Sequence, residues 1–553
     1  MSLSMHNRSS RLFTLMSCVL LAACDNSLVV TNPNVVDVEA AFRTAQGIEQ
    51  VVGKSFQGLF QGQYASLNSL MPQAMNSSGE SAASVANSGM GLRTGIPRQV
   101  IDNQLGNQTF SGNFRDFSFM TRFGRQAANG LKALKTLTLV DPQTARARAL
   151  GYFVIGYAQG NIALMYDSAA VIRPDTVDQA NLSGASAVMD NALLMLDSAI
   201  AIASNPAQIT NPAGESAFPI PAAAFLNGNS VSAVRFVQIA RSYKARFRAG
   251  VARTTAARTD VNWSAVEADA AAGIATDLSV ALDGAIGWSI GGTIGQMAVF
   301  GGWHQMPLLY AGMADTTNAY ANYIAVGSFV SARTGFLVQT PDNRWPKGAT
   351  RAAQQAFQAA TVPAAGVYFR NRPSGEDVND NGNPWANSNY DHFRWRPIND
   401  ANGIGVWTLM SFREIAMLRA EALIRLGRTA EALPLINASR TLNNLPAIPA
   451  GASVVPGGTA AAPVIGGASC VPRVPVSLAT TACGSVFEAM KYEKRMESAM
   501  TGYAQWFIDN RGWGDLVVGT PTEWPVPIQE ANSRGKVAYN GLLRQAAPST
   551  YFF

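Results

Sequence analysis

Histidine is scarce in this sequence, and the residue patterns of common catalytic sites are absent from it. Among 553 residues there are three histidines, His6, His304 and His392. The sequence has no H-E-x-x-H zinc-protease pattern, no G-x-S-x-G hydrolase pattern and no P-loop. A glycosidase needs two carboxylates in a cleft, and nothing in the sequence selects such a pair. We therefore expect a protein that is not an enzyme and that carries no cofactor.

Charge is also sparse, and no run of basic residues is present. Charged residues make up 14% of the chain, and the formal net charge is +6. Nucleic-acid-binding proteins carry a basic stripe or patch, so nucleic acid is not an expected partner. The hydrophobic fraction of 48% is ample for a large core.

The start of the chain carries a signal pattern. Arg8 and Arg11 precede an apolar run of twelve residues, 12–23, which is shorter than the roughly 20 residues that a membrane-spanning helix needs. The run ends in Leu-Ala-Ala before Cys24, a sequence that lipoprotein signal peptidase accepts. We expect residues 1–23 to be a signal peptide and Cys24 to carry the lipid anchor. An ordinary secretory signal with a chance cysteine is the alternative.

The mature chain, 24–553, is expected to form one domain outside the bilayer. Removing the signal lowers the formal charge from +6 to +4, and no later apolar segment is expected to span a membrane. Of the four cysteines, only Cys470 and Cys483 are then free to pair. In an oxidising compartment they are predicted to form a disulfide worth about 3 kcal/mol. Without CxxC spacing or a nearby histidine, a metal or redox role is not indicated.

Hydrophobic periodicity predicts a mostly α-helical fold. The clearest signal is at 412–428 and 429–442, where Gly427 separates two amphipathic segments. Two helices joined so closely pack antiparallel, as in a tetratricopeptide-type hairpin. A further helix is expected after the Asn-Pro-Asn turn, in 35–62, with Asp37 as its N-cap. The other predicted helices are 117–137, 145–166, 185–204, 231–253 and 262–275.

Two long stretches read as loops. Residues 280–400 are rich in Gly, Asn, Asp and Pro and contain Trp288, Trp303, Trp345, Trp385 and Trp395. Residues 446–482 form a Pro/Gly/Ala/Val-rich insertion, whose base the cysteine pair is expected to tie. Long loops in a helical scaffold are usually functional or disordered, and the aromatic residues favour function in the first stretch.

Sugar-binding sites use aromatic faces together with polar side chains. The candidate ligand-binding residues of the first stretch, each of which also fits a packing role, are Trp288, Trp303, Trp345, Tyr368 and Arg370. Peptide capture would instead use polar loops such as 71–95. The sequence permits both.

A calcium-loop pattern begins at Asp377. Asp377, Asn379 and Asn381 stand at the first, third and fifth positions, and Gly382 stands at the turn position. The glutamate expected at the twelfth position is missing, because Ser388 stands there. A structural calcium ion and an ordinary Asn/Asp/Gly turn are both consistent with this segment.

Several segments together resemble the SusD/RagB family of nutrient-binding lipoproteins. These are CDNSLVVTNPN after the signal, FMTRFGRQAANGLKAL, LRAEALIRLGRTAEALPLIN, and YEKRMESAMTGYAQWFIDNRGWGDL followed by EWPVPIQEANSRG. The resemblance implies about four tetratricopeptide-like helical hairpins under a large loop-rich ligand face. It implies an outer-membrane lipid anchor, a TonB-dependent β-barrel transporter (SusC-like) as partner, and binding of oligosaccharides or oligopeptides without chemistry.

The sequence departs from the starch-binding prototype of that family in one respect. The early loop 71–95 has no aromatic residue, so no starch-binding arc can be placed on it. The charged and aromatic segment 492–516 fits either a ligand platform or a structural helix, and we expect the structural role. Asp25 after Cys24 signals inner-membrane retention in some bacteria, so the outer-membrane placement rests on the resemblance.

We therefore expect a surface-exposed, lipid-anchored binding protein that passes its ligand to a transporter. A helical scaffold for envelope proteins is the alternative hypothesis, and a polysaccharide-degrading enzyme is a weaker third. A binding protein predicts exposed Trp and Tyr side chains in 280–400. A scaffold predicts those side chains buried.

Overall fold

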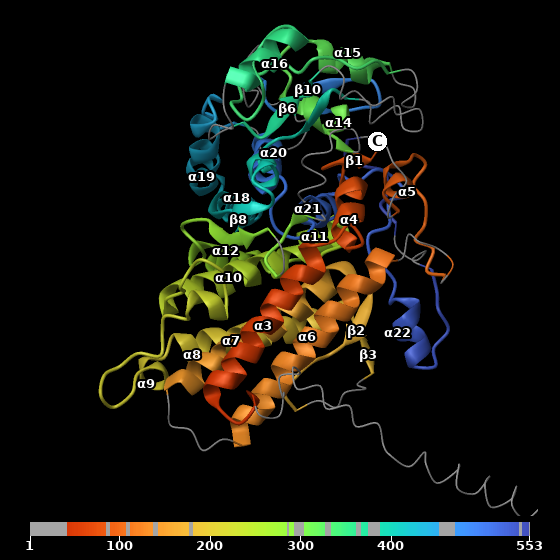
Figure 1. Cartoon of the computed structure of the whole chain (residues 1–553). Helices are drawn as coiled ribbons and strands as arrows, with labels where there is room; N and C mark the ends of the chain where they lie inside the picture. The colour runs from red at the N-terminus through yellow and green to blue at the C-terminus, as the bar shows by residue number, and fades with distance from the viewer. Residues whose placement is uncertain are drawn as a thin grey trace, which may run out of the picture.

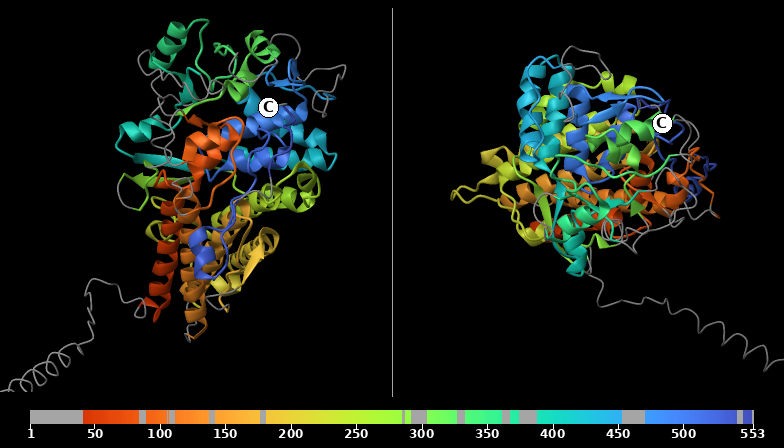
Figure 2. Two further views of the ribbon diagram at one scale, coloured as in Figure 1. Left: turned by 90° about the vertical axis from the view of Figure 1, so that its right-hand side faces the viewer. Right: turned by 90° about the horizontal axis from the view of Figure 1, so that it is seen from above.

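Helices dominate the computed structural model (Figure 1). It describes residues 41–551 except 84–88, 105, 107–110, 137–141, 176–180, 285–286, 292–303, 327–332, 361–366, 374–387, 453–469 and 541–544. The longest described helices lie in the lower half of the molecule, and short helices and strands lie in the upper half, as the turned views in Figure 2 also show.

The lower half is an array of helices that pack on one another in succession. Neighbouring pairs include α6 on α7, α7 on α8, α8 on α10 and α10 on α12. The helices of this array are α3 (Ala45–Tyr64), α6 (Ser111–Thr136), α7 (Pro142–Met165), α8 (Ala185–Ala203), α9 (Pro206–Ile209), α10 (Ala233–Gly250), α11 (Thr255–Thr259) and α12 (Trp263–Ala271). This succession is the mostly α-helical architecture that the sequence predicts.

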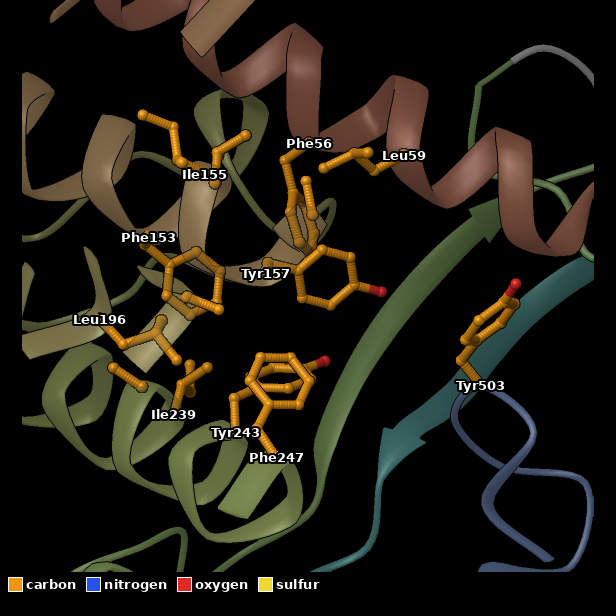
Figure 3. Close-up of a cluster of buried hydrophobic side chains, with 14 of the residues drawn as sticks. Phe56, Leu59, Phe153, Ile155, Tyr157, Leu196, Ile239, Tyr243, Phe247 and Tyr503 are labelled. Atoms are coloured by element: carbon orange, nitrogen blue, oxygen red, sulfur yellow. The ribbon is translucent and has the colours of Figure 1, made fainter. Parts of the chain in front are cut away.

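Aromatic side chains from three of these helices and a nearby loop form the centre of the core. The ring of Phe153 on α7 lies 5.4 Å from that of Phe236 and 5.9 Å from that of Tyr243, both on α10. Phe56 on α3 contacts Tyr157 at 5.2 Å. Figure 3 shows Phe56, Phe153, Tyr157 and Tyr243 gathered between the helices. Each such ring buries a large apolar area, so this cluster joins helices that are distant in the sequence.

The predicted hairpin is confirmed. α18 (Phe412–Arg425) packs on α19 (Thr429–Leu442), and Gly427 between them has a left-handed φ of +75°. Glycine adopts this backbone conformation without steric cost, which ends one helix and allows the next to begin within four residues.

The upper half, which we call the head, contains short elements from distant parts of the chain. Its strands pair as β1–β5, β6–β7 and β9–β10, all antiparallel. The elements are α4 (Leu70–Ser78), β1 (Ala82–Ala83), α5 (Met90–Thr94), β5 (His304–Gln305), α14 (Leu308–Ala311), α15 (Ala319–Ala325), α16 (Arg351–Ala360), β6 (Phe369–Asn371), β7 (Tyr390–His392), α17 (Arg396–Asp400), β9 (Arg473–Pro475) and β10 (Thr481–Cys483).

Two more strand pairs and three helices complete the fold. β2 (Ser168–Ala170) pairs with β3 (Leu182–Gly184), and β4 (Leu278–Asp283) pairs with β8 (Ile404–Met410). α22 (Ile528–Ser533) lies on the lower right in Figure 1. α20 (Val486–Ser498) and α21 (Gln505–Trp513) lie inside the molecule, where all residues of α21 and all residues of α20 except Phe487 are buried.

The buried state of α20 and α21 confirms the structural role expected for 492–516. Arg495 binds Asp515, and Lys494 lies 2.9 Å from Asp509. Arg511 donates to the backbone oxygens of Leu164, Thr522 and Gly250. These charged side chains therefore hold the fold together and offer no ligand surface.

The disulfide between Cys470 and Cys483 is confirmed, with Cα atoms 5.3 Å apart. It closes the β9–β10 hairpin, which is the last part of the predicted insertion, and does not join the ends of 446–482. The loop between the two cysteines is also paired by strands.

Four other expectations need correction. α3 begins at Ala45 with Thr44 as its N-cap, because the chain turns at 42–44, and Asp37 lies outside the described residues. The early loop 71–95 is helical in α4 and α5, and all of α4 is buried. The block 280–400 holds the unpredicted helices α14 to α17. Among the described residues, α8 is long and apolar enough to span a bilayer by composition, although half of it is buried inside the fold.

Two buried carboxyl groups hold the turn between α20 and α21. Glu80 accepts a hydrogen bond from the backbone N–H of Met500 at 2.8 Å, and Asp116 accepts one from the hydroxyl of Tyr503. Burial raises the pKa of Glu80 to about 8 and that of Asp116 to about 7. The folded protein therefore keeps two protons that the unfolded chain releases near pH 4.

This difference predicts a pH dependence of stability. The stabilisation of the folded state that these two carboxyl groups provide is complete below about pH 4. It is lost as the pH rises towards their folded pKa values of about 7 and 8. In Glu80→Gln, which keeps a carbonyl acceptor for Met500, we expect the free energy of unfolding to decline less steeply between about pH 5 and 7.5. The difference should be about 1.4 kcal/mol per pH unit in urea titrations. Asp260→Asn, at an exposed position, should keep the wild-type slope, and equal slopes in all three proteins would contradict the prediction.

Candidate functional site

Five of the residues singled out in the sequence lie outside the described residues. They are the lipid-anchor candidate Cys24, the ligand candidate Trp303 and the calcium candidates Asp377, Asn379 and Asn381. Their roles stay predictions.

The expectation that Trp288 and Trp345 face outwards is wrong. Trp288 is 7% exposed, and its ring lies 5.0 Å from that of Phe60 on α3. Trp345 is fully buried and stacks on Phe369 with ring centroids 4.2 Å apart. Both indoles pack in the core, because large aromatic rings gain more from burial than the surrounding loop composition suggests.

Arg370 is also buried, and it binds a carboxylate of the protein. Its guanidinium donates to both oxygens of Asp391 at 2.8 and 2.9 Å, across the β6–β7 pair. Burial raises the pKa of Asp391 to about 6, against the lowering effect of Arg370. This bidentate pair fixes the register of the two strands and is not a ligand contact.

Of the predicted ligand-binding residues that the structure describes, Tyr368 is the one that stays partly exposed. It directly precedes β6, and residues 393–395 directly follow β7. Because the two strands are antiparallel, these flanking residues meet at one end of the hairpin, where Phe393 and Arg394 donate backbone N–H groups to the Tyr368 carbonyl. The sequence therefore brings Tyr368 together with Arg394 and Trp395.

These three side chains form an aromatic–arginine stack, which we call the Tyr368–Trp395 stack. The Arg394 guanidinium lies 4.2 Å from the Tyr368 ring centroid and 4.8 Å from that of Trp395. All three side chains are half-buried. Stacking of a guanidinium on aromatic rings is favourable and leaves ring edges and N–H groups for other contacts.

The stack is fixed to the buried helix α20 through Glu497. The Tyr368 hydroxyl lies 3.3 Å from the Glu497 carboxylate, and Arg394 donates to the Glu497 backbone oxygen at 3.1 Å. Burial raises the pKa of Tyr368 to about 12, against the lowering effect of Arg394, so the hydroxyl stays protonated at neutral pH. Arg344 binds the same carboxylate from the other side at 3.1 Å. The stack therefore stands on a rigid support.

Chemically, this site is suited to binding. Aromatic faces contact the C–H surfaces of sugars or apolar side chains, and a guanidinium donates to hydroxyl, carbonyl or carboxylate oxygens. Among the described residues no group of three His, Cys, Asp or Glu side chains is placed to hold a metal ion. The sequence analysis missed Arg394 as a site residue and noted Trp395 only as one of five tryptophans. The alternation of aromatic residues and arginines in FRWR, 393–396, is the signal that points to them.

The two described histidines lie in a separate, buried place. His304 on β5 pairs with Ala83 on β1, and neither ring nitrogen has a hydrogen-bond partner among the described residues. His392 on β7 bonds the backbone oxygen of Glu80 at 2.7 Å. Burial lowers the pKa of His304 to about 3 and that of His392 to about 4, so both are neutral at pH 7.

A surface cavity lies far from the head. It has a volume of about 640 Å³ and is lined by residues from α6, the β3 region and α22, namely Thr121, Asn181, Leu182, Glu530, Ser533, Arg534 and Lys536. Its charged lining is largely internally paired, since Arg534 binds Glu530 at 2.6 Å. We assign no ligand to it.

Comparison with solved structures identifies the fold. A SusD superfamily protein from Bacteroides vulgatus matches with a TM-score of 0.52 and 10% identity, over 89% of this chain and 90% of that one. A SusD-like carbohydrate-binding protein from Bacteroides fragilis matches with a TM-score of 0.51 and 12% identity, over 87% of this chain and 90% of that one. No protein-family model and no curated protein sequence matches this chain.

The fold is therefore SusD-like along most of the chain. This confirms, at the level of the fold, the resemblance to SusD/RagB proteins that the sequence segments carry. At 10–12% identity the comparison transfers the architecture and no ligand.

The different burial of Trp345 and Trp395 predicts that replacing each by alanine lowers the free energy of unfolding by a different amount. We expect Trp345→Ala to lower the free energy of unfolding by about 3–5 kcal/mol, because it removes a fully buried ring. Trp395→Ala should cost about 1–2 kcal/mol, because its ring is half-buried. Urea unfolding followed by circular dichroism measures both. A larger loss for Trp395→Ala than for Trp345→Ala would contradict the assigned burial.

Proposed function

We propose that this protein is a non-catalytic nutrient-binding lipoprotein that captures oligosaccharide fragments at the Tyr368–Trp395 stack. The observation that carries the proposal is a half-exposed aromatic–arginine stack, rigidly supported by α20, on a SusD-like fold. One of the two structural neighbours is itself described as carbohydrate-binding.

The chemistry of the stack fits an oligosaccharide. The apolar face of a pyranose packs on an aromatic ring, and the Arg394 N–H groups suit its ring and hydroxyl oxygens. An oligopeptide is the second ligand class, because the same guanidinium binds carbonyl and carboxylate oxygens. The charge of the stack favours neither class, since the Arg394 guanidinium donates equally well to sugar hydroxyls and to peptide oxygens.

The proposal extends to anchoring and transport. Cleavage before Cys24 would leave a lipid-modified N-terminus that holds the protein on the outer membrane, facing the cell surface. A TonB-dependent β-barrel transporter of the SusC-like kind would receive the ligand. The resemblance of the sequence segments supports both steps. A structural calcium ion at Asp377, Asn379 and Asn381 stays a prediction.

One observation favours the alternative, a helical scaffold for envelope proteins. Trp288 and Trp345 are buried, as a scaffold predicts, so two of the expected stacking surfaces are absent. The two functions differ in whether the purified protein binds a small oligomer and whether the stack is needed for it.

Ligand binding tests the proposed function directly. Residues 24–553, with Cys24 replaced by serine, are titrated with a panel of neutral oligosaccharides, acidic oligosaccharides and oligopeptides in a calorimeter. We expect at least one oligosaccharide to bind, and Trp395→Ala to weaken its binding by about tenfold or more, the equivalent of 1.4 kcal/mol.

A matched control is present elsewhere in the chain. Arg413 lies 4.7 Å from the Phe412 ring centroid and forms a half-buried arginine–aromatic pair at the start of α18. Phe412→Ala should leave the affinity unchanged. Equal effects of Phe412→Ala and Trp395→Ala, or binding of peptides alone, would overturn the sugar assignment. Absence of binding across the panel would favour the scaffold.

Co-purification tests the transporter partner. We expect full-length, tagged protein extracted from membranes in mild detergent to carry a large β-barrel protein in near-stoichiometric amount. Cys24→Ser should move the protein out of the membrane fraction, because the thiol that receives the lipid is absent. A wild-type sample without a barrel at both low and high salt would contradict the transport step and leave the binding assay unaffected.

A further inference from the structure

In the described part of the chain, the β4–β8 ribbon is covered along one edge only. On the outer edge of β4, the turn 226–229 supplies partners for Ala281, whose N–H donates to the Asn227 carbonyl at 3.0 Å and whose carbonyl accepts from the Asn227 side chain at 2.8 Å. The opposite edge of the ribbon belongs to β8, and no third strand pairs with it among the described residues.

The register shows which groups of β8 face that edge. In an antiparallel pair, the backbone N–H and C=O groups of two opposite residues either bond to each other or both point away from the partner strand. The backbone N–H and C=O of Ala281 point away from β8, so those of its partner Val406 point away from β4. The opposite residues Asp283 and Ile404 follow the same rule. The Asp283 N–H donates to the Trp288 carbonyl, and the Ile404 N–H donates to the Ala401 carbonyl. The N–H and C=O of Val406 therefore project from the open edge, without a backbone partner among the described residues.

The side chains at this edge are apolar and exposed. Ile404 is 58% and Val406 is 64% exposed, and both point to the outer face, while Trp407, the residue after Val406, is fully buried on the inner face. No residue of β8, 404–410, is charged or proline. Natural sheet edges are commonly protected by lysine, proline, bulges or covering loops, and the exposed part of β8 has none of these in its own sequence.

We propose that the open edge of β8 at Ile404–Val406 is a docking site for an extended segment of a partner protein, which adds to the ribbon as a third strand. The segment places an apolar, β-branched side chain beside Val406, on the same face of the enlarged sheet. Its backbone supplies the acceptor and donor that Val406 lacks.

The free backbone groups of Val406 favour an extended protein segment over an oligosaccharide. A backbone N–H and C=O at strand spacing are matched by another extended backbone, whereas an oligosaccharide has no such repeat. A second rigid copy of this chain is less suited, because the exposed part of the strand spans only Ile404–Val406. Stable interfaces between rigid proteins bury roughly 1,200–2,000 Å² in total, and a flexible segment can extend its contacts beyond this short edge.

The edge is independent of ligand capture by the Tyr368–Trp395 stack but close to it. Trp395 caps α17, which packs on β8, and its ring lies 6.5 Å from that of Trp407. A partner strand on β8 would therefore lie beside the candidate ligand site without using its three side chains.

The test uses a labelled seven-residue peptide, Lys-Thr-Val-Thr-Val-Thr-Lys, with blocked ends, and the mature protein in fluorescence anisotropy. The valines stand beside Val406 in the proposed pairing, so their N–H groups face β8 and those of the threonines face away. We expect N-methylation of both valines to weaken binding by about tenfold or more, and N-methylation of the threonines at positions 2 and 6 to leave it within about threefold.

Variants of the protein test the same bonds from the other side. Val406→Pro removes the donor and should abolish binding, whereas Val406→Thr keeps both the donor and the branched side chain and should bind as the wild type. Ile404→Lys, which leaves the backbone of Val406 intact, should weaken binding through the side chain alone. Circular dichroism confirms that each variant is folded.

Three results would overturn the proposal. The first is no binding of the unmodified peptide, and the second is equal loss with either methylation pattern. The third is a dimer of the wild type in light scattering that Val406→Pro dissociates, because the occupant of the edge would then be a second copy of the chain.

Discussion

The buried charges of α20 are the constraint on which the rest of the head depends. Glu488, Lys491, Glu493, Lys494, Arg495 and Glu497 are all nearly inaccessible to water. A buried ion is strongly destabilising unless it is paired, so each of these side chains requires a partner in a fixed position. The partners come from distant segments: Asp515 binds Lys491 and Arg495, Asp509 binds Lys494, and Arg344 binds Glu493 and Glu497. Tertiary structure around α20 is thereby specified by charge as well as by apolar packing.

Arg344 carries this constraint to the candidate site. Burial alone would lower its pKa, but Asp342 and Glu493 raise it well above the usual value, so the guanidinium stays charged. Its backbone carbonyl accepts the N–H groups of Tyr368 and Phe369, and its side chain binds Glu497, which in turn contacts Tyr368 and Arg394. The aromatic–arginine stack is therefore positioned from two sides by one buried ion network. A binding surface built this way needs little ordering when a ligand arrives, which favours affinity.

Local sequence patterns predicted the elements that are determined locally. The α18–α19 hairpin follows from two amphipathic segments and Gly427. The disulfide follows from the sequence because only Cys470 and Cys483 were expected to be free to pair. The site was less predictable, because burial in the head is decided by contacts between distant residues. Trp345 lies in a segment whose composition resembles an exposed loop, yet its ring stacks on Phe369 of β6. α4 is buried on all sides, its polar residues included, so burial in α4 does not follow the alternation of apolar and polar faces by which periodicity marks a helix. Arg394 and Trp395 become neighbours of Tyr368 only through the pairing of β6 with β7.

β8 links the candidate ligand site to the centre of the molecule. On its inner face, the Trp407 indole donates to the Met500 carbonyl at 3.1 Å, and Met500 has a left-handed φ of +53°. Such a conformation is costly for a residue with a side chain, and the structure maintains it through this bond and through the N–H bond to Glu80. Trp407 also faces Trp395, while the neighbouring Val406 points to solvent. A strand with one face fixed to the core and an open outer edge can hold a partner without a change in its own conformation. Binding at either place would therefore act on a preformed surface, and the two places are connected by the contact of Trp395 with Trp407 and by the packing of α17 on β8.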